Sequence, residues 1–306
     1  YYVKTSRQGK GDGSSWENAM NGKDFAVYLP LAPDGATFYV AEGEYMPDSE
    51  YSKQSDGVYF TTDAINVSIV GGFSTDIKRD TLSDPQKYET ILRSVEKAER
   101  CFVSNSTNFY SIVFESPLLV RFPGNKTVTF DKCTFREIDA AHYYTPSTGS
   151  SIVGHYQTPE SIIEFRECQF LNNKSTLLQG YQTPYNVGVD KYYGCSFVGN
   201  EADILFYLPG LFSGSSDLYE IVNCTFSKNK AKQFFSFHGG LRFYNNSFFN
   251  NEADVFLYDQ SSDNCESSTL VGNVFLKNDF TTILDGGRRT TSSYYFDLVK
   301  YDLFQS

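Results

Sequence analysis

The sequence contains no apolar run long enough to cross a membrane, and it has only two Met, one Trp and three His in 306 residues. It also lacks an excess of basic side chains, since its formal net charge is −11. Nucleic-acid binding requires a basic face, so this charge excludes a nucleic acid as the expected partner. No Cys-x-x-Cys pair and no Cys/His spacing typical of zinc occurs, so we predict neither a metal site nor a cofactor.

Long, periodic segments free of glycine are absent as well, which argues against arrays of helical hairpins. What the sequence contains instead is a repeat. The segment LYEIVNCTFSKNKAKQFFSF begins at Leu218, and LRFYNNSFFNNEADVFLY begins at Leu241. In both copies a Cys or Asn lies two residues before a Phe, an Asn lies three residues after it, and an Ala lies five residues after it.

The same template fits six places, separated by 35, 27, 29, 22 and 27 residues, and such periods indicate a solenoid. Its Phe falls on Phe135, Phe170, Phe197, Phe226, Phe248 and Phe275. The position two before the Phe holds Cys133, Cys168, Cys195, Cys224, Asn246 and Asn273. The position three after it holds Ile138, Asn173, Asn200, Asn229, Asn251 and Asn278.

Within each repeat, apolar residues alternate with polar ones, slip by one position and alternate again, which is typical of short strands joined at corners. A third and more apolar strand follows the Asn. Three short strands per repeat predict an all-β fold, a single right-handed parallel β-helix whose equivalent residues stack about 4.8 Å apart. We expect one domain over residues 1–306, with an N-terminal cap at 1–36 and coils at 37–306.

The N-terminal segment is predicted to cover the open end of the β-helix, because an open end would expose core side chains and unpaired strand edges. Ser14 and Glu17 have the spacing of a capping box, which predicts one helix or two short helices ended by Pro30 and Gly35. Strands are expected next at 37–41 and 67–73. The apolar residues of the predicted helices are Trp16, Ala19, Phe25, Val27 and Leu29.

Four of the six Cys occupy one column of the repeat. Free Cys behaves as a small buried hydrophobe, so we interpret these residues as packed thiols. Stacked Cα atoms would also lie within disulfide range, so bridging stays an open alternative.

Four segments near the N-terminus resemble a known group of proteins. They are GDGSSWENAM from Gly11, ATFYVAEGEYMP from Ala36, VSIVGGFSTDIKRD from Val67 and YETILRS from Tyr88. These segments are similar to the opening of secreted right-handed β-helix proteins of the pectin-lyase-like group of Bacteroidetes, and related openings occur in polymorphic outer-membrane adhesins. The resemblance implies an exported protein, extracellular or at the cell surface. Because the chain starts at Tyr1 without a leader, we expect a mature or trimmed form, not membrane-spanning and monomeric.

The loops after each third strand start from the same column, so they are expected on one side of the solenoid. Tyr is abundant in them, and the motif YQTP occurs twice, from Tyr156 and from Tyr181. Aromatic rings bind the apolar faces of sugars, so we predict a carbohydrate-binding groove on this side. The alternative is that these rings only cover loop backbones. The predicted ligand-binding residues are Tyr143, Tyr144, His155, Tyr156, Tyr181, Tyr185, Tyr207 and Tyr258.

A competing hypothesis is a polysaccharide lyase or glycoside hydrolase acting on an acidic glycan. A lyase on this fold needs a basic residue as general base, and calcium held by carboxylates is possible as its cofactor. The candidate sets are Arg288 and Arg289 with Asp285 and Asp259, and His238 with Arg242. A strand end before a tight turn is the simpler explanation of His238, and a solvated turn is the simpler explanation of Arg288 and Arg289. The sequence therefore favours an exported β-helix that binds carbohydrate or another extracellular partner along one loop face, with catalysis as the second hypothesis.

Overall fold

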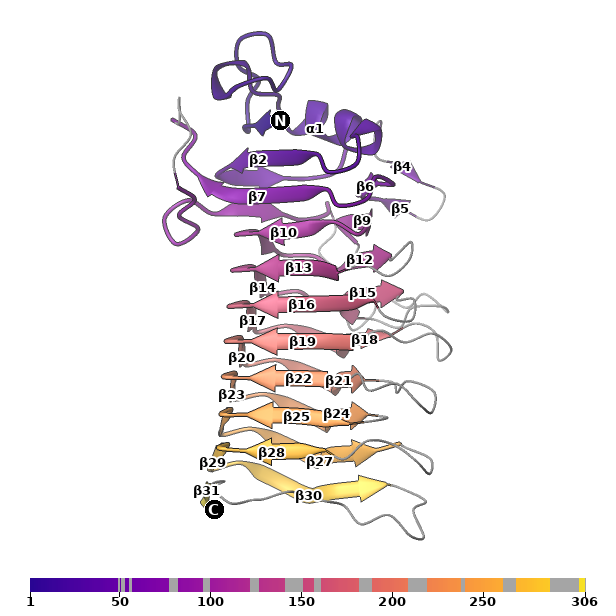
Figure 1. Ribbon diagram of the computed structural model, residues 1–306, viewed down its shortest axis with the longest axis vertical. Helices are drawn as coiled ribbons and strands as arrows, with labels where there is room; N and C mark the ends of the chain where they lie inside the picture. Colours follow the sequence, from indigo (N-terminus) through magenta and orange to yellow (C-terminus); the bar gives the residue numbers. More distant parts are fainter. Residues whose placement is uncertain are drawn as a thin grey trace.

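The computed structural model describes most of the chain. The described residues are 1–48, 50, 53–54, 57–76, 82–95, 100–121, 127–140, 151–156, 161–181, 189–208, 219–237, 240–260, 268–286 and 303–305. They form a column of stacked coils with the N-terminus at one end and the C-terminus at the other (Figure 1). The fold is a right-handed parallel β-helix, as the repeat predicts.

Each complete coil contributes one strand to each of three parallel sheets. The first sheet consists of β1 (Tyr2–Val3), β2 (Thr37–Ala41), β7 (Ser68–Phe73), β10 (Asn108–Tyr110), β13 (Thr127–Asp131), β16 (Ile162–Arg166), β19 (Val189–Tyr193), β22 (Tyr219–Val222), β25 (Leu241–Tyr244) and β28 (Thr269–Val271). The second consists of β3 (Gly43–Tyr45), β8 (Thr90–Leu92), β11 (Val113–Phe114), β14 (Thr134–Arg136), β17 (Gln169–Leu171), β20 (Ser196–Val198), β23 (Thr225–Ser227), β26 (Ser247–Phe249), β29 (Val274–Leu276) and β31 (Leu303–Gln305).

The third sheet has the longest strands among those described, and its last five along the chain have eight residues each (Figure 1). It consists of β6 (Phe60–Thr62), β9 (Phe102–Asn105), β12 (Leu118–Arg121), β15 (Ser151–Tyr156), β18 (Lys174–Tyr181), β21 (Glu201–Leu208), β24 (Lys230–Phe237), β27 (Glu252–Asp259) and β30 (Asp279–Gly286). A separate antiparallel pair joins β4 (Lys53–Gln54) and β5 (Gly57–Val58).

The template Phe residues form one buried column in the second sheet, as predicted. Their backbones pair in register from Phe135 to Phe275. Neighbouring rings are stacked, with centroids 4.5 to 4.8 Å apart. Each coil therefore buries its aromatic ring against the equivalent ring of the next coil, which gives a continuous apolar contact along the axis.

The Asn column forms a hydrogen-bond ladder between coils. Asn200 Nδ2 donates to the Phe170 carbonyl oxygen and to Asn229 Oδ1, both at 2.9 Å. The backbone N–H of Asn173 donates in turn to Asn200 Oδ1 at 3.1 Å. These side chains are buried, so the ladder satisfies backbone groups that the corner leaves outside the sheets.

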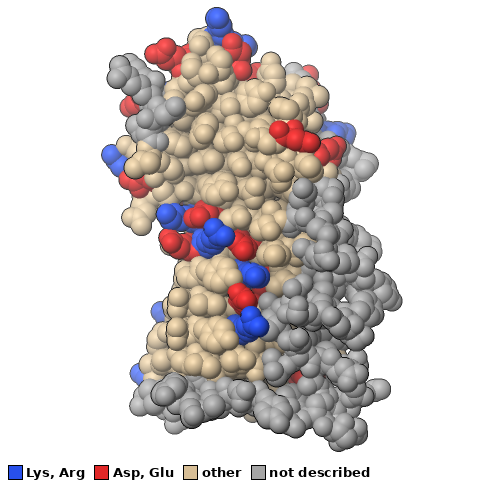
Figure 2. Space-filling model, in the orientation of Figure 1, with Lys and Arg blue, Asp and Glu red and all other residues tan. Residues whose placement is uncertain are grey.

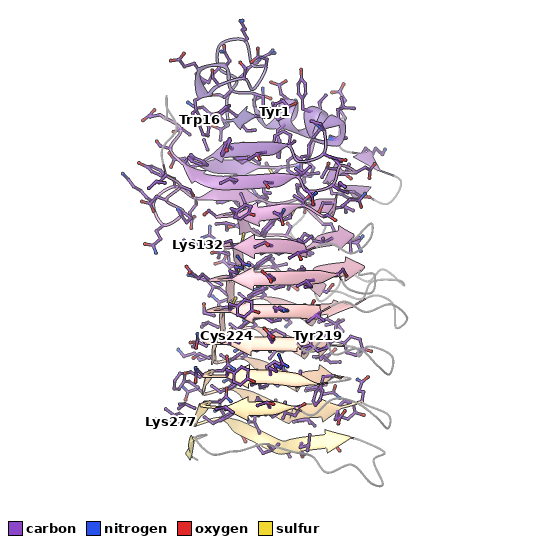
Figure 3. All side chains as sticks on the ribbon, in the orientation of Figure 1. Tyr1, Trp16, Lys132, Tyr219, Cys224 and Lys277 are labelled. Atoms are coloured by element: carbon purple, nitrogen blue, oxygen red, sulfur yellow. The ribbon has the colours of Figure 1, made fainter. Side chains whose placement is uncertain are left out.

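The Cys column is buried at the other corner of the second sheet, where Figure 3 places Cys224. Cys101, Cys133, Cys168, Cys195 and Cys224 carry free thiols. Cys265 lies outside the described residues. The interpretation of the column as packed, unbridged thiols is thus confirmed.

Two columns of corner residues have a positive φ, near 55°, although several of them carry long side chains. Examples are Lys132 at φ 53° and Lys277 at φ 53°, whose side chains project from the column (Figure 3). A left-handed residue costs about 1 kcal/mol or more outside glycine, so the paired strands on both sides must hold each corner in place.

Helix α1 (Gly22–Tyr28) covers the N-terminal end of the column, as expected of the cap. Its Phe25 ring lies 5.2 Å from the rings of both Phe38 and Phe60. The predicted capping box at Ser14 and Glu17 is wrong, because the box is formed by Asn21 and Asp24. The short helices η1 (Trp16–Asn18) and η2 (Leu29–Leu31) flank α1.

Trp16 explains why the helix begins later than predicted. Its ring lies against the outer surface of the first sheet, 4.9 Å from the Tyr2 ring and 5.3 Å from the Phe73 ring. This contact holds the segment before Asn21 outside the column. No helix among the described residues is long and apolar enough to span a membrane.

Candidate ligand-binding face

The outer surface of the first sheet is the best candidate for a binding site. Its outward side chains are those six and four residues before the template Phe, because the residues between them point into the core. We call the part of this surface between β10 and β25 the front face, and it faces the viewer in Figure 1. Its residues are Asn108, Tyr110, Thr129, Asp131, Glu164, Arg166, Lys191, Tyr193, Glu220, Val222, Arg242 and Tyr244.

Glu220 is the centre of a polar network on the front face. The Tyr193 hydroxyl donates to Glu220 Oε2 at 2.6 Å, and Lys191 Nζ lies 3.9 Å from the same oxygen. Arg242 lies on the next strand, with Nη1 3.4 Å from Glu220 Oε1. Partial burial, followed by the hydrogen bond to Glu220, raises the pKa of Tyr193, so this phenol stays protonated and donating at neutral pH.

Charges on the front face are balanced. Arg166 forms an ion pair with Glu164, beside the network of Glu220. Three cationic and three acidic side chains are present in all, and Figure 2 shows them gathered over the middle coils, below a broad area without charged side chains. A surface of this kind offers planar hydrogen-bonding groups without selecting strongly for ligand charge.

Three tyrosines are interleaved with these polar groups in one column. Tyr110 lies three coils from Tyr193, and Tyr193 lies two coils from Tyr244. With coils about 4.8 Å apart, the separations along the axis are about 14 and 10 Å. The side chains of all three are partly exposed. Aromatic rings at intervals of whole coils, with Asp, Glu and Arg side chains between them, suit the apolar faces and hydroxyl groups of an extended sugar chain.

Among the predicted catalytic residues, Arg242 lies on this face, whereas Asp285 lies on β30 of the third sheet. The structure therefore assigns them to different sheets, and Arg242 forms an ion pair with Glu220. Arg288, Arg289 and His238 lie outside the described residues.

The predicted sugar platforms Tyr207 and Tyr258 lie in one column of the third sheet, near the C-terminal ends of β21 and β27. Ser236 separates them, and Asp285 follows Tyr258 on the next strand. Ser236 is fully buried and its Oγ accepts a hydrogen bond from Gln260 Nε2. Burial raises the pKa of Tyr207, whose side chain is only partly exposed.

For three further predicted residues the structure describes the backbone. His155 pairs in register with Tyr181, and Tyr156 pairs with Arg121 of the preceding coil. The two YQTP motifs thus begin on adjacent strands, β15 and β18, one residue out of register. Tyr143, Tyr144 and Tyr185 lie outside the described residues.

Sequence reasoning missed the front face because it considered loops alone. The positions six and four residues before the template Phe flank the apolar position five before it. This alternation predicts that their side chains point outward and form a face. It also missed Asp190, a fully buried carboxyl in an inward-facing position next to Tyr219. Burial, and then the charge of Asp190, raise the pKa of Tyr219, the first residue of β22 (Figure 3).

No cluster of His, Cys, Asp or Glu suited to a metal ion occurs within the described ranges. The fold places this protein in the class of parallel β-helix solenoids with a capped N-terminal end. No family model matches the chain, and neither a curated protein nor a solved structure matches it.

Proposed function

We propose that this protein is an exported, cell-surface β-helix that binds an extended carbohydrate along its front face. The observation that carries the proposal is the column of Tyr110, Tyr193 and Tyr244 interleaved with the network of Glu220 and Arg242. Export is supported by the resemblance of the N-terminal segments to secreted β-helix proteins of the pectin-lyase-like group.

The geometry favours a long ligand over a compact one. The first sheet is straight along the axis, so equivalent side chains recur at intervals of about 4.8 Å. Each tyrosine can contact one sugar ring, while the side chains between them can bond hydroxyl groups. Because single contacts with sugars are weak, affinity should grow with chain length until the ligand spans from Tyr110 to Tyr244.

A glycan array followed by calorimetry tests the proposal. The double variant Tyr193→Ala/Tyr244→Ala should reduce affinity for the selected glycan at least tenfold, because two stacking contacts of about 1 kcal/mol each are lost. The variant Tyr207→Ala/Tyr258→Ala serves as control, since these residues lie on the third sheet. If only the second variant loses binding, the ligand lies beside the loops instead.

The same purified chain should be incubated with acidic glycans while unsaturated uronate is monitored by absorbance. Release of unsaturated uronate would show that the protein is a lyase and would contradict binding without catalysis. The variant Arg288→Ala/Arg289→Ala would then test whether these residues supply the predicted base. Surface proteolysis of intact cells tests export, because an exposed protein is cleaved without lysis.

A further inference from the structure

A second charged surface lies on the third sheet, on strands that start just after the Asn column. It is a groove of about 380 Å³. Its floor is made of small side chains, chiefly Ala202, Ala231 and Ala253, and two rows of polar side chains flank it. We call it the charged groove. The rows contain Lys174, Glu201, Lys230, Glu252 and Asp279 on one side, and Thr176, Asp203, Lys232, Asp254 and Thr281 on the other.

On the three central coils the two rows have the same sign, and this sign alternates from one of these coils to the next. On the outer coils β18 and β30 one row carries a charge, Lys174 or Asp279, and the other row carries a threonine. Glu201 and Asp203 flank the groove on β21, and Glu252 and Asp254 flank it on β27. Between these acidic coils lies β24, which carries Lys230 and Lys232. The charge sequence along the axis is therefore acidic, basic and acidic, in steps of about 4.8 Å.

Ion pairs inside the rows account for part of this pattern. Lys230 Nζ lies 2.8 Å from Glu252, and Lys232 Nζ lies 2.8 Å from Asp203. These four side chains are 51 to 73% exposed, so each pair contributes at most about 1 kcal/mol and is easily exchanged for a ligand group. The pairs therefore do not close the groove to a charged ligand.

Two observations show that the polar groups of the groove are not all paired with each other. The carboxylates of Asp254 and Asp279 have no ion pair among the described residues, and Asp279 lies directly beside Glu252 in register. Like charges side by side on adjacent strands are destabilising. At the other end of the groove, Ser175 lies in register with Ala202 in the floor, is 5% exposed and has an Oγ without a hydrogen-bond partner among the described residues.

We propose that the charged groove binds a linear zwitterionic glycan, in which ammonium and carboxylate groups alternate from one sugar to the next. Ammonium groups of such a chain face the acidic coils β21 and β27, and a carboxylate faces Lys230 and Lys232. A slender chain fits a groove between two rows, whereas a second copy of this sheet would meet the rows and leave the alanine floor empty. The charged groove lies on the third sheet and the front face on the first, so the proposal for one site can be wrong while the proposal for the other holds.

Calorimetry with three matched hexasaccharides tests the proposal at low salt. De-N-acetylated hyaluronan carries alternating ammonium and carboxylate groups, hyaluronan carries carboxylates alone, and chitosan carries ammonium groups alone. The zwitterionic chain should bind at least tenfold more tightly than either of the others. Equal affinity for all three, or no binding of the first, overturns the proposal.

The variant Lys230→Glu/Lys232→Glu makes the middle coil acidic, so preference should switch from the zwitterionic chain to chitosan. The matched control Lys10→Glu/Lys132→Glu changes the net charge equally, away from the groove, and should leave the preference unchanged. Circular dichroism checks that both variants are folded. Light scattering compares the oligomeric state of the parent protein with that of Lys230→Glu/Lys232→Glu. If the parent is a dimer and this variant is a monomer, a second copy occupies the groove and the proposal is wrong.

Tyr193→Ala/Tyr244→Ala separates the two sites. This variant should leave binding of the zwitterionic chain unchanged, since the tyrosines lie on the first sheet. Loss of that binding would place the glycan on the front face and would overturn the assignment to the groove.

Discussion

Cysteine and asparagine fulfil one structural task at the corners of the second sheet, in different regions of the column of coils. In the column before the sheet, Cys195 donates its S–H to the Phe165 carbonyl oxygen at 3.3 Å. Further along the same column, Asn246 Nδ2 donates to the Ile221 carbonyl oxygen at 2.8 Å, and its Oδ1 accepts the Cys224 backbone N–H at 2.9 Å. Asn246 Nδ2 also donates to Asn273 Oδ1 of the following coil at 3.0 Å. The asparagine side chain thus joins a coil to both neighbours, whereas the thiol donates to one.

The difference separates packing from hydrogen bonding. A thiol fills the corner and makes a weak hydrogen bond, so its loss should be felt mainly as lost volume. An amide in the ladder satisfies buried backbone groups of the neighbouring coil, so its loss leaves those groups unpaired. Four predictions test this contrast, beginning with the asparagine side chains and ending with the cysteines.

The largest effect is expected from Asn200→Ala in the all-amide column. The change removes two donated hydrogen bonds and leaves the Asn173 backbone N–H without its acceptor. We expect the free energy of unfolding to fall by about 4 kcal/mol, measured by urea denaturation. Thr225→Ala, at an outward and partly exposed position, should change it by less than about 0.5 kcal/mol. A loss below 1 kcal/mol for Asn200→Ala would show that water replaces the ladder.

Asn246→Cys should have an intermediate effect. It extends the cysteine column by one coil, and the Cys224 backbone N–H loses its side-chain acceptor. We expect a loss of about 2 kcal/mol in the same denaturation experiment, from one unsatisfied buried donor. Equal stability of variant and parent would mean that cysteine and asparagine are interchangeable here.

The thiols should also make stability dependent on pH, which the amides cannot do. Burial raises the pKa of the Cys168 and Cys224 thiols above the ordinary value. A raised pKa means that the contribution of each thiol is complete below about pH 8.5 and declines above it, by about 1.4 kcal/mol per pH unit for each thiol. Denaturation between pH 7 and 10 should show this decline, with a smaller slope for Cys168→Ala/Cys224→Ala. A slope unchanged by the double variant would assign the decline to other groups.

The smallest effect is expected from Cys224→Asn. The introduced amide would lie between the Tyr192 carbonyl oxygen, which the thiol now contacts at 3.6 Å, and the amide of Asn246. New hydrogen bonds then offset the extra volume, and the free energy of unfolding should change by less than about 1 kcal/mol. A larger loss would show that the corner has no room for an amide.

Most of the fold could be predicted because each residue of a repeat has the same surroundings in every coil. The template Phe is buried and stacked in all six repeats, from Phe135 to Phe275, so each repeat supports the prediction made for the others. The N-terminal segment occurs once, and its helix start was predicted at Ser14 instead of Asn21 because the contact of Trp16 with Phe73 is not local in sequence. Unique contacts of this kind leave no periodic pattern.

The candidate site was harder to predict for a related reason. Periodicity shows which side chains point outward, but not which of them other segments cover. Tyr193 and Ser236 both point outward, yet Tyr193 is partly exposed and Ser236 is fully buried. The residues on the front face were therefore readable from the repeat, whereas their accessibility required the structure.

The stacked Phe rings have a mechanical consequence. With centroids 4.5 to 4.8 Å apart over five successive contacts, the core is a rod of aromatic rings that can neither shorten nor slide. Every side chain anchored to that rod keeps a fixed height above its neighbours. For the proposed ligands this means that only a polymer whose repeat is close to about 4.8 Å, or a multiple of it, can place successive groups opposite successive coils.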